Sequence, residues 1–562
     1  MKGEILTPTS VWNDFNIEQT PTAEIIGEYR EGDISLQRIR INGASVQDCQ
    51  VKIYSVFARN VKKKKAPAVF ILQRFTDGAD ESLVMTFARM GFSAFVVNVG
   101  GDDSVNNNYT LYPESLSYAN YKNAKNHLDT VTGEVKDTCW YQWGVTARYA
   151  LTYLKSLPSV TKVAGMGIGD SATVLWHLAV SEKFDCLAFV LNAGWRAYKG
   201  NFKFSGNVDE QFTDDKIKYL AGIEPQSYAN YVRTPTIMLT ATNSAEFDFE
   251  RAHDTVARIK DVLTVVHYTI GGIDSVDYNA FTHLTAFFNE FLIKNKTQDN
   301  VSLPNEVTIR CEIEDKKLKV YVCPYADKIK EVSVYCAEQI LNPALRQWQK
   351  LTEYKMVGDE MVFEYLPYDK SGIAFFFASV TYKTGYTVNS DIIAKKFKNQ
   401  DVAPSHKSKI LYSSREANSI SAFYPSGATV KKPSGLAIKQ GPFVEEKKGA
   451  MDIWGITCES GLISFKIGMD KYRPSQDGIL LLDAYLKEKG TVTVKLITYC
   501  YGDKIEYKAS AKVAGGEIWN NLRFSLSSFK SNEGMTVRSI EKIQAIEINA
   551  DQEYLINNVL WV

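Results

Sequence analysis

One stretch of sequence, Val163 to Val180, constrains the fold more than any other part of the chain. It reads VAGMGIGDSATVLWHLAV, which is a short apolar run, a glycine-dense turn and a helical segment that begins with small residues. A continuous apolar run of this kind is typical of a strand that is buried on both faces of a parallel sheet. We therefore expect a strand, a sharp turn and a helix at the centre of an α/β domain.

The segments around this unit alternate between strand and helix patterns. The segment 139–157 is the clearest helix, because six apolar residues share one face, and we expect it to end at Pro158. Further strands are expected at 68–72, 92–99, 187–191, 236–242 and 263–270, and further helices at 81–90 and 279–292. This alternation predicts a mostly parallel sheet with helices on both faces.

The remaining sequence is predicted to be β-structure. Residues 1–60 alternate in the manner of antiparallel strands and are assigned to the α/β domain, which spans 1–300. Beyond Lys296 the helical signal disappears. We expect residues 301–398 to form a β-sandwich of immunoglobulin or fibronectin type. Lys395 to Lys409 is polar and is expected to be a linker, and residues 403–562 are expected to form a jelly roll.

Composition excludes several classes of function. Lys plus Arg equals Asp plus Glu at 65 each, so no overall field favours nucleic acid or an anionic membrane. The N-terminal residues lack the apolar core of a signal peptide, and no apolar run approaches the ~18 residues of a membrane span. The eight cysteines are scattered, which favours free thiols in a reducing cytoplasm, and the six histidines lack metal-ligand spacing. We therefore expect a cytoplasmic protein without metal or cofactor.

The turn has the context of a nucleophile elbow, in which the Ser of G-x-S-x-G stands between a strand and a helix. Here the matching residues are Gly167-Ile168-Gly169-Asp170-Ser171, so glycine occupies the apex. The elbow residue is held in strained backbone geometry, which glycine adopts without the penalty of a Cβ atom. The scaffold of an esterase is thus predicted without its nucleophile.

Three segments resemble acetyl xylan esterases and related dienelactone-hydrolase-like α/β hydrolases: CWYQWGVTARYALTYLKSLPSV, GIGDSATVLWHLAV and LNAGWRAYKG. The elbow of that family reads roughly G-I-S-x-G-G-x-x-x-W, which places its Ser on Gly169 when Trp176 is aligned. The resemblance covers about 300 residues. It continues into β domains that look like the fibronectin-type and galactose-binding-like modules appended to some of these proteins.

The resemblance also implies where the other catalytic groups would lie. Asp248 takes the position of the acid, although a solvated loop carboxylate is an equal alternative. The base would lie in the loop 271–277, which holds no histidine and has Asp274 at its centre. His267 and His283 flank this loop as possible displaced bases, and His177 is expected to be a packed residue of the elbow helix.

Four residues are expected to line the pocket beside the elbow. Arg74 and Phe75 follow the strand 68–72, where the family has small residues beside the oxyanion hole, so their bulk should partly fill the pocket. Asp170 follows the apex, and Trp195 lies in the third resembling segment.

Two alternatives would restore a nucleophile. Ser171 lies in G-D-S-A-T, and taking it as the apex would correct the position of Pro158, which is two residues nearer the elbow than expected. A two-residue deletion around Thr161 would explain the same shortening. Asp170 could act as a carboxylate nucleophile, but a charge in the first turn of a helix also interacts favourably with the helix dipole.

These observations lead to three functional hypotheses. The first is a catalytically degenerate esterase-like protein that acts in binding or assembly, since losing both apex Ser and base His removes two groups that acyl transfer needs. Its ligand would be a carbohydrate, which is favoured, or a small acylated molecule. The second is an active carboxyl-ester hydrolase, such as a sugar deacetylase, built on Ser171 with a displaced histidine. The third is a scaffold for a protein partner.

If the jelly roll binds saccharide, an exposed aromatic ring should form a platform for it. Tyr412, Tyr424 and Trp454 lie near polar loops and are the candidates, whereas Trp519 and Trp561 lie in alternating patterns typical of a core. The sequence predicts no particular oligomeric state.

Overall fold

The computed structural model describes most of the chain. The described residues are 4–124, 128–198, 202–204, 212–244, 247–272, 275–293, 303–304, 306–324, 328–338, 341, 343, 346, 348–367, 371–398, 400–403, 409–414, 423–426, 443–500, 503–516 and 518–561.

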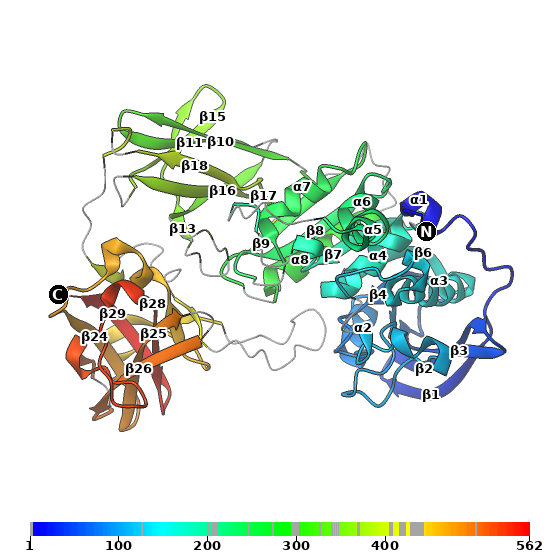
Figure 1. Ribbon diagram of the computed structural model, residues 1–562, viewed down its shortest axis with the longest axis horizontal. Coiled ribbons are helices and arrows are strands. Elements are labelled where there is room, and N and C mark those ends of the chain that lie inside the picture. Colours follow the sequence, from blue (N-terminus) through cyan, green and yellow to red (C-terminus); the bar gives the residue numbers. More distant parts are fainter. Residues whose placement is uncertain are drawn as a thin grey trace.

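The N-terminal half is built on one nine-stranded sheet with the order β1-β2-β3-β5-β4-β6-β7-β8-β9 (Figure 1). The first three strands and β5 pair antiparallel, and all neighbours from β5 to β9 pair parallel. The strands are β1 (Ala23–Glu31), β2 (Ile34–Val46), β3 (Cys49–Asn60), β4 (Ala66–Leu72), β5 (Ser93–Val97), β6 (Val160–Ile168), β7 (Cys186–Val190), β8 (Thr236–Ala241) and β9 (Thr264–Thr269).

Helices cover both faces of this sheet, as the alternation predicted. In β4, Phe70 and Leu72 belong to the core under α3 and α4, while Val69 and Ile71 belong to the core under α2 and α8. A strand buried in both directions needs a continuous apolar run. The helices are α1 (Pro8–Val11), α2 (Glu81–Arg89), α3 (Cys139–Ser156), α4 (Ala172–Ala179), α5 (Asp214–Gly222), α6 (Pro225–Ala229), α7 (Ala252–Val256) and α8 (Tyr278–Phe288).

The next part of the chain forms two antiparallel sheets. One has the order β10-β11-β15-β14, and the other has the order β13-β12-β16-β17 with β18 also paired to β16. The bounds are β10 (Val307–Glu314), β11 (Lys317–Pro324), β12 (Ile329–Glu338), β13 (Gln349–Leu351), β14 (Lys355–Val357), β15 (Glu360–Tyr365), β16 (Gly372–Tyr382), β17 (Thr387–Asn389) and β18 (Ile393–Phe397).

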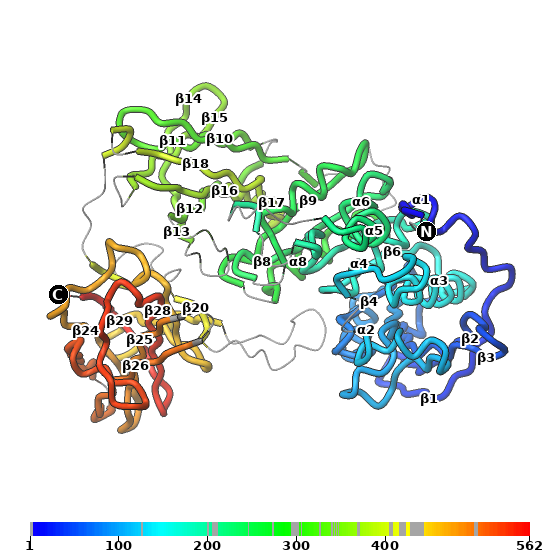
Figure 2. The backbone as a smooth tube through the Cα atoms, in the orientation of Figure 1, coloured from blue at the N-terminus to red at the C-terminus, as the bar shows by residue number. Residues whose placement is uncertain are grey.

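The C-terminal part also consists of two antiparallel sheets, with the orders β21-β22-β29-β24-β27 and β20-β23-β28-β25-β26. Figure 2 shows this part at the opposite end of the molecule from the N-terminus. The bounds are β19 (Ile410–Tyr412, paired to β29), β20 (Tyr424–Pro425), β21 (Glu445–Lys448), β22 (Trp454–Thr457), β23 (Leu462–Ser464), β24 (Ile479–Leu486), β25 (Gly490–Cys500), β26 (Asp503–Val513), β27 (Asn520–Ser525), β28 (Ile543–Ala550) and β29 (Tyr554–Trp561).

The helices and strands predicted for the α/β domain occur in the structure with ends within two residues of those expected, except for the last helix. The helix expected at 139–157 is confirmed as α3, and all six residues of its apolar face are fully buried. The last helix ends in a π turn, Asn289–Ile293, rather than continuing as α-helix. The linker expected from Lys395 was wrong at its start, because residues 393–397 pair with β16 as β18. Backbone pairing there outweighed the polar composition on which the prediction rested.

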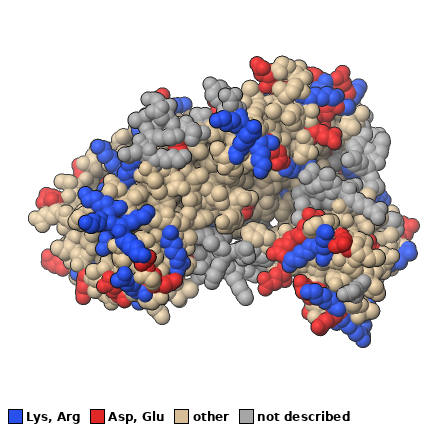
Figure 3. Space-filling model, turned by 180° about the vertical axis from the view of Figure 1, so that it is seen from behind, with Lys and Arg blue, Asp and Glu red and all other residues tan. Residues whose placement is uncertain are grey.

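Acidic and basic side chains are interspersed over the face drawn in Figure 3, with a group of basic side chains on the α/β part at the left. Two cations of this region are paired: Arg38 of β2 lies 2.5 Å from Glu81, and Lys62, just after β3, lies 2.6 Å from Asp33. No helix within the described ranges combines the length and apolar character that a bilayer crossing requires.

Candidate functional site

The turn between β6 and α4 places Gly169 at its tip. β6 ends at Ile168, residues 169–171 form a short 3-10 turn, and α4 begins at Ala172. The φ angle of Gly169 is 61°, which lies in the left-handed region that L-residues rarely adopt. A Cβ atom at this position would lie 3.0 Å from Cγ of Arg74. The backbone and the neighbouring side chain therefore both favour glycine at the tip.

A second glycine allows the helix to approach the strand. A Cβ atom on Gly167 would lie 2.6 Å from Cα of Ala172, a distance that backbone atoms cannot accommodate. One turn further along α4, Trp176 stacks on Phe189 of β7 with ring centroids 3.7 Å apart. Glycine at 167 and the buried indole together fix α4 against the sheet.

Ser171 lies inside this unit, away from solvent. Its side chain is fully buried, and its hydroxyl lies 2.9 Å from the carbonyl oxygen of Leu72 and 2.8 Å from that of Ile168. The single hydroxyl proton is thus directed at backbone acceptors. A hydroxyl in this position ties the elbow to the end of β4 and is not presented to a substrate.

The segment after β4 fills the space beside the elbow. Arg74 lies against Gly169, as the predicted bulk of this segment implied. Phe75 is buried, and its ring centroid lies 4.2 Å from that of Trp143 and 5.1 Å from that of Tyr121. The aromatic cluster occupies volume beneath the segment in which small residues were expected.

The loop after β7 lies against the elbow and carries Trp195. Asn192 donates its side-chain amide to the carbonyl oxygen of Gly169 at 2.9 Å. Trp195 has a φ angle of 65°, and its indole Nε1 donates to Oγ1 of Thr255 at 2.9 Å. The guanidinium of Arg251 lies 4.7 Å from the centroid of the Trp195 ring. These contacts fix the half-buried indole in place and stabilise the strained backbone conformation of Trp195.

Asp170 belongs to a charged cluster that the sequence did not reveal. Its carboxylate pairs with the guanidinium of Arg196, whose Nε also lies 2.9 Å from Oδ1 of Asp129. Glu224 is fully buried beside this pair and accepts hydrogen bonds of 2.9 Å from the backbone N–H groups of Arg196 and Ala197. Burial raises the pKa of Glu224 to about 7. The carboxylate of Asp170 is engaged in an ion pair instead of facing an open pocket.

Asp248 follows β8, where the resemblance places the acid. It is nearly buried, and its carboxylate accepts hydrogen bonds from the backbone N–H groups of Lys203 and Glu250, both at 3.1 Å. Nε of Arg251 lies 3.0 Å from Oδ2 of Asp248. Burial, reinforced by the charge of Glu250, raises the pKa of Asp248 to about 7. Arg251 therefore connects this carboxylate to the ring of Trp195.

None of the four histidines in the described ranges hydrogen-bonds to Ser171 or Asp248. The rings of His267 and His283 are buried against each other with centroids 4.3 Å apart, on β9 and α8. Burial lowers the pKa of His283 to about 4. His177 packs inside the domain, and its Nε2 lies 2.8 Å from the carbonyl oxygen of Ile223. Asp274, which marks the loop where a base would lie, falls outside the described residues.

The neighbouring β domains cover the loops after β8 and β9. Arg346 reaches Glu250 at 2.5 Å, and both side chains are fully buried. Asn243, at the end of β8, donates to the carbonyl oxygen of Arg346 at 2.6 Å. Tyr424 donates its hydroxyl to the same carbonyl at 3.0 Å, and its ring lies against Gly271. Parts from three regions of the chain thus meet at the edge of the sheet where an acid and a base would stand. We call this region the three-part joint.

The aromatic candidates of the C-terminal part have different surroundings. Tyr412 is fully buried and Tyr424 belongs to the three-part joint, so the platform predicted at these residues was wrong. Trp454 is 46% exposed. Trp561 is buried in the core, as expected, whereas Trp519 is only partly buried.

Sequence reasoning did not identify Arg196, Glu224, Glu250 and Arg346 as residues of this region. Arg196 could have been found, since it stands just beyond the carboxyl end of β7, where parallel sheets place their sites. Arg346 comes from another domain and carries no local signal. In the part of the chain that the structure describes, no three His, Cys, Asp or Glu side chains converge as ligands for a metal ion.

Comparisons by sequence identify no relatives. No family model matches the chain, and no curated protein matches it significantly.

Comparisons by structure match about half of the chain to solved esterases. An acetyl xylan esterase from Paenibacillus sp. R4 aligns over 51% of this chain and 92% of its own, with 12% identity and a TM-score of 0.39. Acetyl xylan esterase 1 from Thermoanaerobacterium sp. JW/SL YS485 aligns over 48% and 87%, with 12% identity and a TM-score of 0.34. The part of this chain that aligns contains the nine-stranded, mostly parallel sheet with helices on both faces. A cold-adapted esterase from an Arctic intertidal metagenomic library aligns over 48% of this chain and 99% of its own, with 10% identity and a TM-score of 0.34. These likenesses concern the fold alone.

Proposed function

We propose that this chain is a catalytically degenerate, acetyl-esterase-like protein that acts by binding, with a carbohydrate as its ligand. The observation that carries the proposal is the elbow, where Gly169 stands at the tip and the Ser171 hydroxyl is directed at two backbone carbonyls. Acyl transfer by this type of site needs an exposed nucleophile whose proton is taken by a positioned base. Neither group has a place in the described part of the elbow.

The three-part joint supports the same proposal. In a working hydrolase, the loops after β8 and β9 must leave room for an acid and a base beside the substrate. Here the buried pair of Glu250 and Arg346 and the hydroxyl of Tyr424 occupy this edge. Removing one partner of a buried ion pair destabilises a protein strongly, because the other charge stays buried without a partner. These loops therefore serve to hold the domains together.

The ligand class rests on the C-terminal part. Its closing segments, residues 515–529 and 539–562, resemble the last strands of galactose-binding-like modules. Its two antiparallel sheets are compatible with such a sandwich. Fibronectin-type and sugar-binding modules remain the proposed identities of the two β domains, with boundaries at 301–398 and 403–562.

Turnover of p-nitrophenyl acetate by the full chain and by Ser171→Ala tests the loss of catalysis. We expect both proteins to hydrolyse the ester no faster than an equal concentration of an unrelated folded protein. Turnover by the wild type that Ser171→Ala abolishes, with an unchanged thermal midpoint, would contradict the proposal. Isothermal titration of the full chain with a panel of oligosaccharides tests the ligand class, and an absence of heat with all of them would contradict it.

A further inference from the structure

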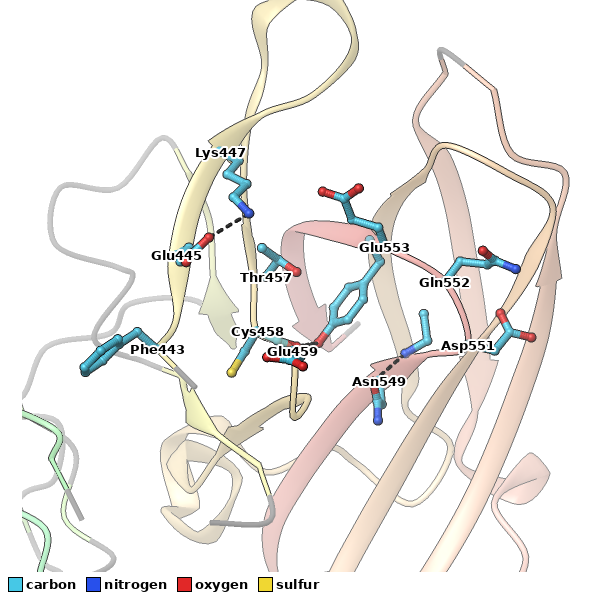
Figure 4. Close-up of a pocket in the computed structure, with 12 residues that line it drawn as sticks. Phe443, Glu445, Lys447, Thr457, Cys458, Glu459, Asn549, Asp551, Gln552 and Glu553 are labelled. Atoms are coloured by element: carbon cyan, nitrogen blue, oxygen red, sulfur yellow. Dashed lines mark hydrogen bonds and ion pairs between the residues drawn. The ribbon is translucent and has the colours of Figure 1, made fainter. Parts of the chain in front are cut away.

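The C-terminal part contains a cavity of about 620 Å³ at one end of its sandwich (Figure 4). One wall is the β21–β22 hairpin, with Glu445, Lys447 and Thr457. The other wall is the end of β28 and the turn 551–553 that leads into β29. A volume of this size is typical of sites for small molecules.

The hairpin wall of the cavity carries a hydroxyl group that makes no hydrogen bond to a described residue. Thr457 is only 8% exposed and lines the cavity, and no hydrogen bond joins its hydroxyl to any described residue. Beside it, Tyr554 is 4% exposed, and its own hydroxyl donates to the carbonyl oxygen of Cys458 at 3.1 Å. Tyr554 therefore contributes a fixed aromatic ring to the lining, while Thr457 retains a free donor and acceptor. The Thr457 hydroxyl is therefore available to a ligand in the cavity as a donor and an acceptor.

The rim of the cavity is rich in oxygen acceptors and negatively charged. Two of its carboxylates are ion-paired, because Glu445 lies 2.6 Å from Lys447 and Glu553 lies 3.1 Å from Lys487. Glu459 has no cationic partner among the described residues. Asp551 likewise has none, and it accepts only the backbone N–H of Thr491 at 2.7 Å. The side-chain amides of Asn549 and Gln552 complete the polar lining (Figure 4).

We propose that this cavity binds a non-acidic saccharide, an inference that deepens the proposed function and rests on it. Carboxylates and amides accept and donate the hydrogen bonds that sugar hydroxyls need, and bonds to ionised groups are the stronger ones. The apolar face of a pyranose ring suits the part of the Tyr554 ring that lines the cavity, and the Thr457 hydroxyl supplies a further donor and acceptor.

Charge decides which saccharides fit. Glu459 and Asp551 repel a second carboxylate and attract an ammonium group, so neutral and amino sugars are accepted and uronic acids are rejected. This selectivity distinguishes the cavity from a surface that binds any polyol.

Saturation-transfer NMR and isothermal titration of the full chain with galactose, glucosamine and galacturonate test the proposal. The variants are Thr457→Val, which removes the hydroxyl at nearly constant volume, and Glu459→Gln, which removes one charge. Asp477→Asn is the matched control, since Asp477 is an exposed carboxylate of the same domain outside the cavity lining. Thermal midpoints verify that each variant is folded.

We expect galactose or glucosamine to bind at least tenfold more tightly than galacturonate. Thr457→Val should weaken this binding about threefold to tenfold, the usual effect of one hydrogen bond. Glu459→Gln should reduce the difference in affinity between glucosamine and galacturonate. Asp477→Asn should leave the affinity for all three sugars unchanged.

Three results would overturn the assignment: no binding of the three sugars, a preference for galacturonate, or binding that neither cavity variant alters. The last result would leave a binding function intact at another site. Binding as expected together with Ser171-dependent ester turnover would instead sustain the cavity and refute the loss of catalysis.

Discussion

Replacing Gly169 by Ser returns the side chain that esterases carry at the elbow, and we expect it to lower stability without restoring hydrolysis. The φ angle of 61° costs an L-residue roughly 1–2 kcal/mol. The new Cβ atom also lies 3.0 Å from Cγ of Arg74, which must move by a few tenths of an ångström. The sum is about 2 kcal/mol, within the range for strained positions, and corresponds to a fall of about 3 °C in the thermal midpoint of a domain of about 300 residues.

Gly32→Ser is the matched control for this variant. Gly32 has a φ angle of 57°, and a Cβ atom there would meet nothing within 4 Å. Both substitutions therefore place a Cβ atom on left-handed backbone, and only the side chain of Gly169→Ser contacts Arg74. Thermal unfolding should show a larger loss for Gly169→Ser than for Gly32→Ser. A Gly169→Ser protein as stable as the wild type would refute the strained elbow, and rapid ester turnover by this single variant would reveal a base that the account lacks.

Three further predictions concern buried charges. Arg346→Met should lower the free energy of unfolding in urea by about 3–5 kcal/mol, because it leaves Glu250 buried without its partner. Adding Glu250→Gln should recover part of this loss. If Arg346→Met is as stable as the wild type, the three-part joint does not depend on the ion pair. Burial raises the pKa of Glu224 to about 7 in the folded state, so this group's contribution to stability is complete below about pH 4.3 and is lost as the pH rises to about 7, by up to about 1.4 kcal/mol per pH unit. Glu224→Gln should therefore show a less negative slope of unfolding free energy between pH 5 and 7, and an unchanged slope would contradict the raised pKa. Burial lowers the pKa of His267 and of His283, the latter to about 4, so their contribution is present above about pH 6.5 and is lost as the pH falls towards 4; thermal midpoints at pH 7.5 and 5 should differ less in a His267→Gln/His283→Gln variant than in the wild type.

The elements of the α/β domain could be predicted because their signals are local. The apolar run of β4, the six buried residues of α3 and the glycines of the elbow each follow from a pattern within 20 residues. Gly169 at the tip is a consequence of the same local pattern.

The surroundings of the elbow could not be predicted in the same way. The cluster of Asp170, Arg196 and Glu224 joins three separate loops, and a buried carboxylate such as Glu224 looks like any surface residue in the sequence. The three-part joint depends on Arg346 and Tyr424, which belong to later regions of the chain. Tyr424 was expected to face a sugar because its neighbours are polar, but packing against Gly271 buries it.

The central claim is that the elbow holds no activated nucleophile, and covalent labelling tests it most directly. The full chain is incubated with a fluorophosphonate, which phosphonylates activated serines, and its intact mass is measured alongside that of Ser171→Ala. The account predicts an unmodified mass for both proteins, because the Ser171 hydroxyl is buried and directed at the carbonyls of Leu72 and Ile168. A single adduct on the wild type that is absent from Ser171→Ala would contradict it.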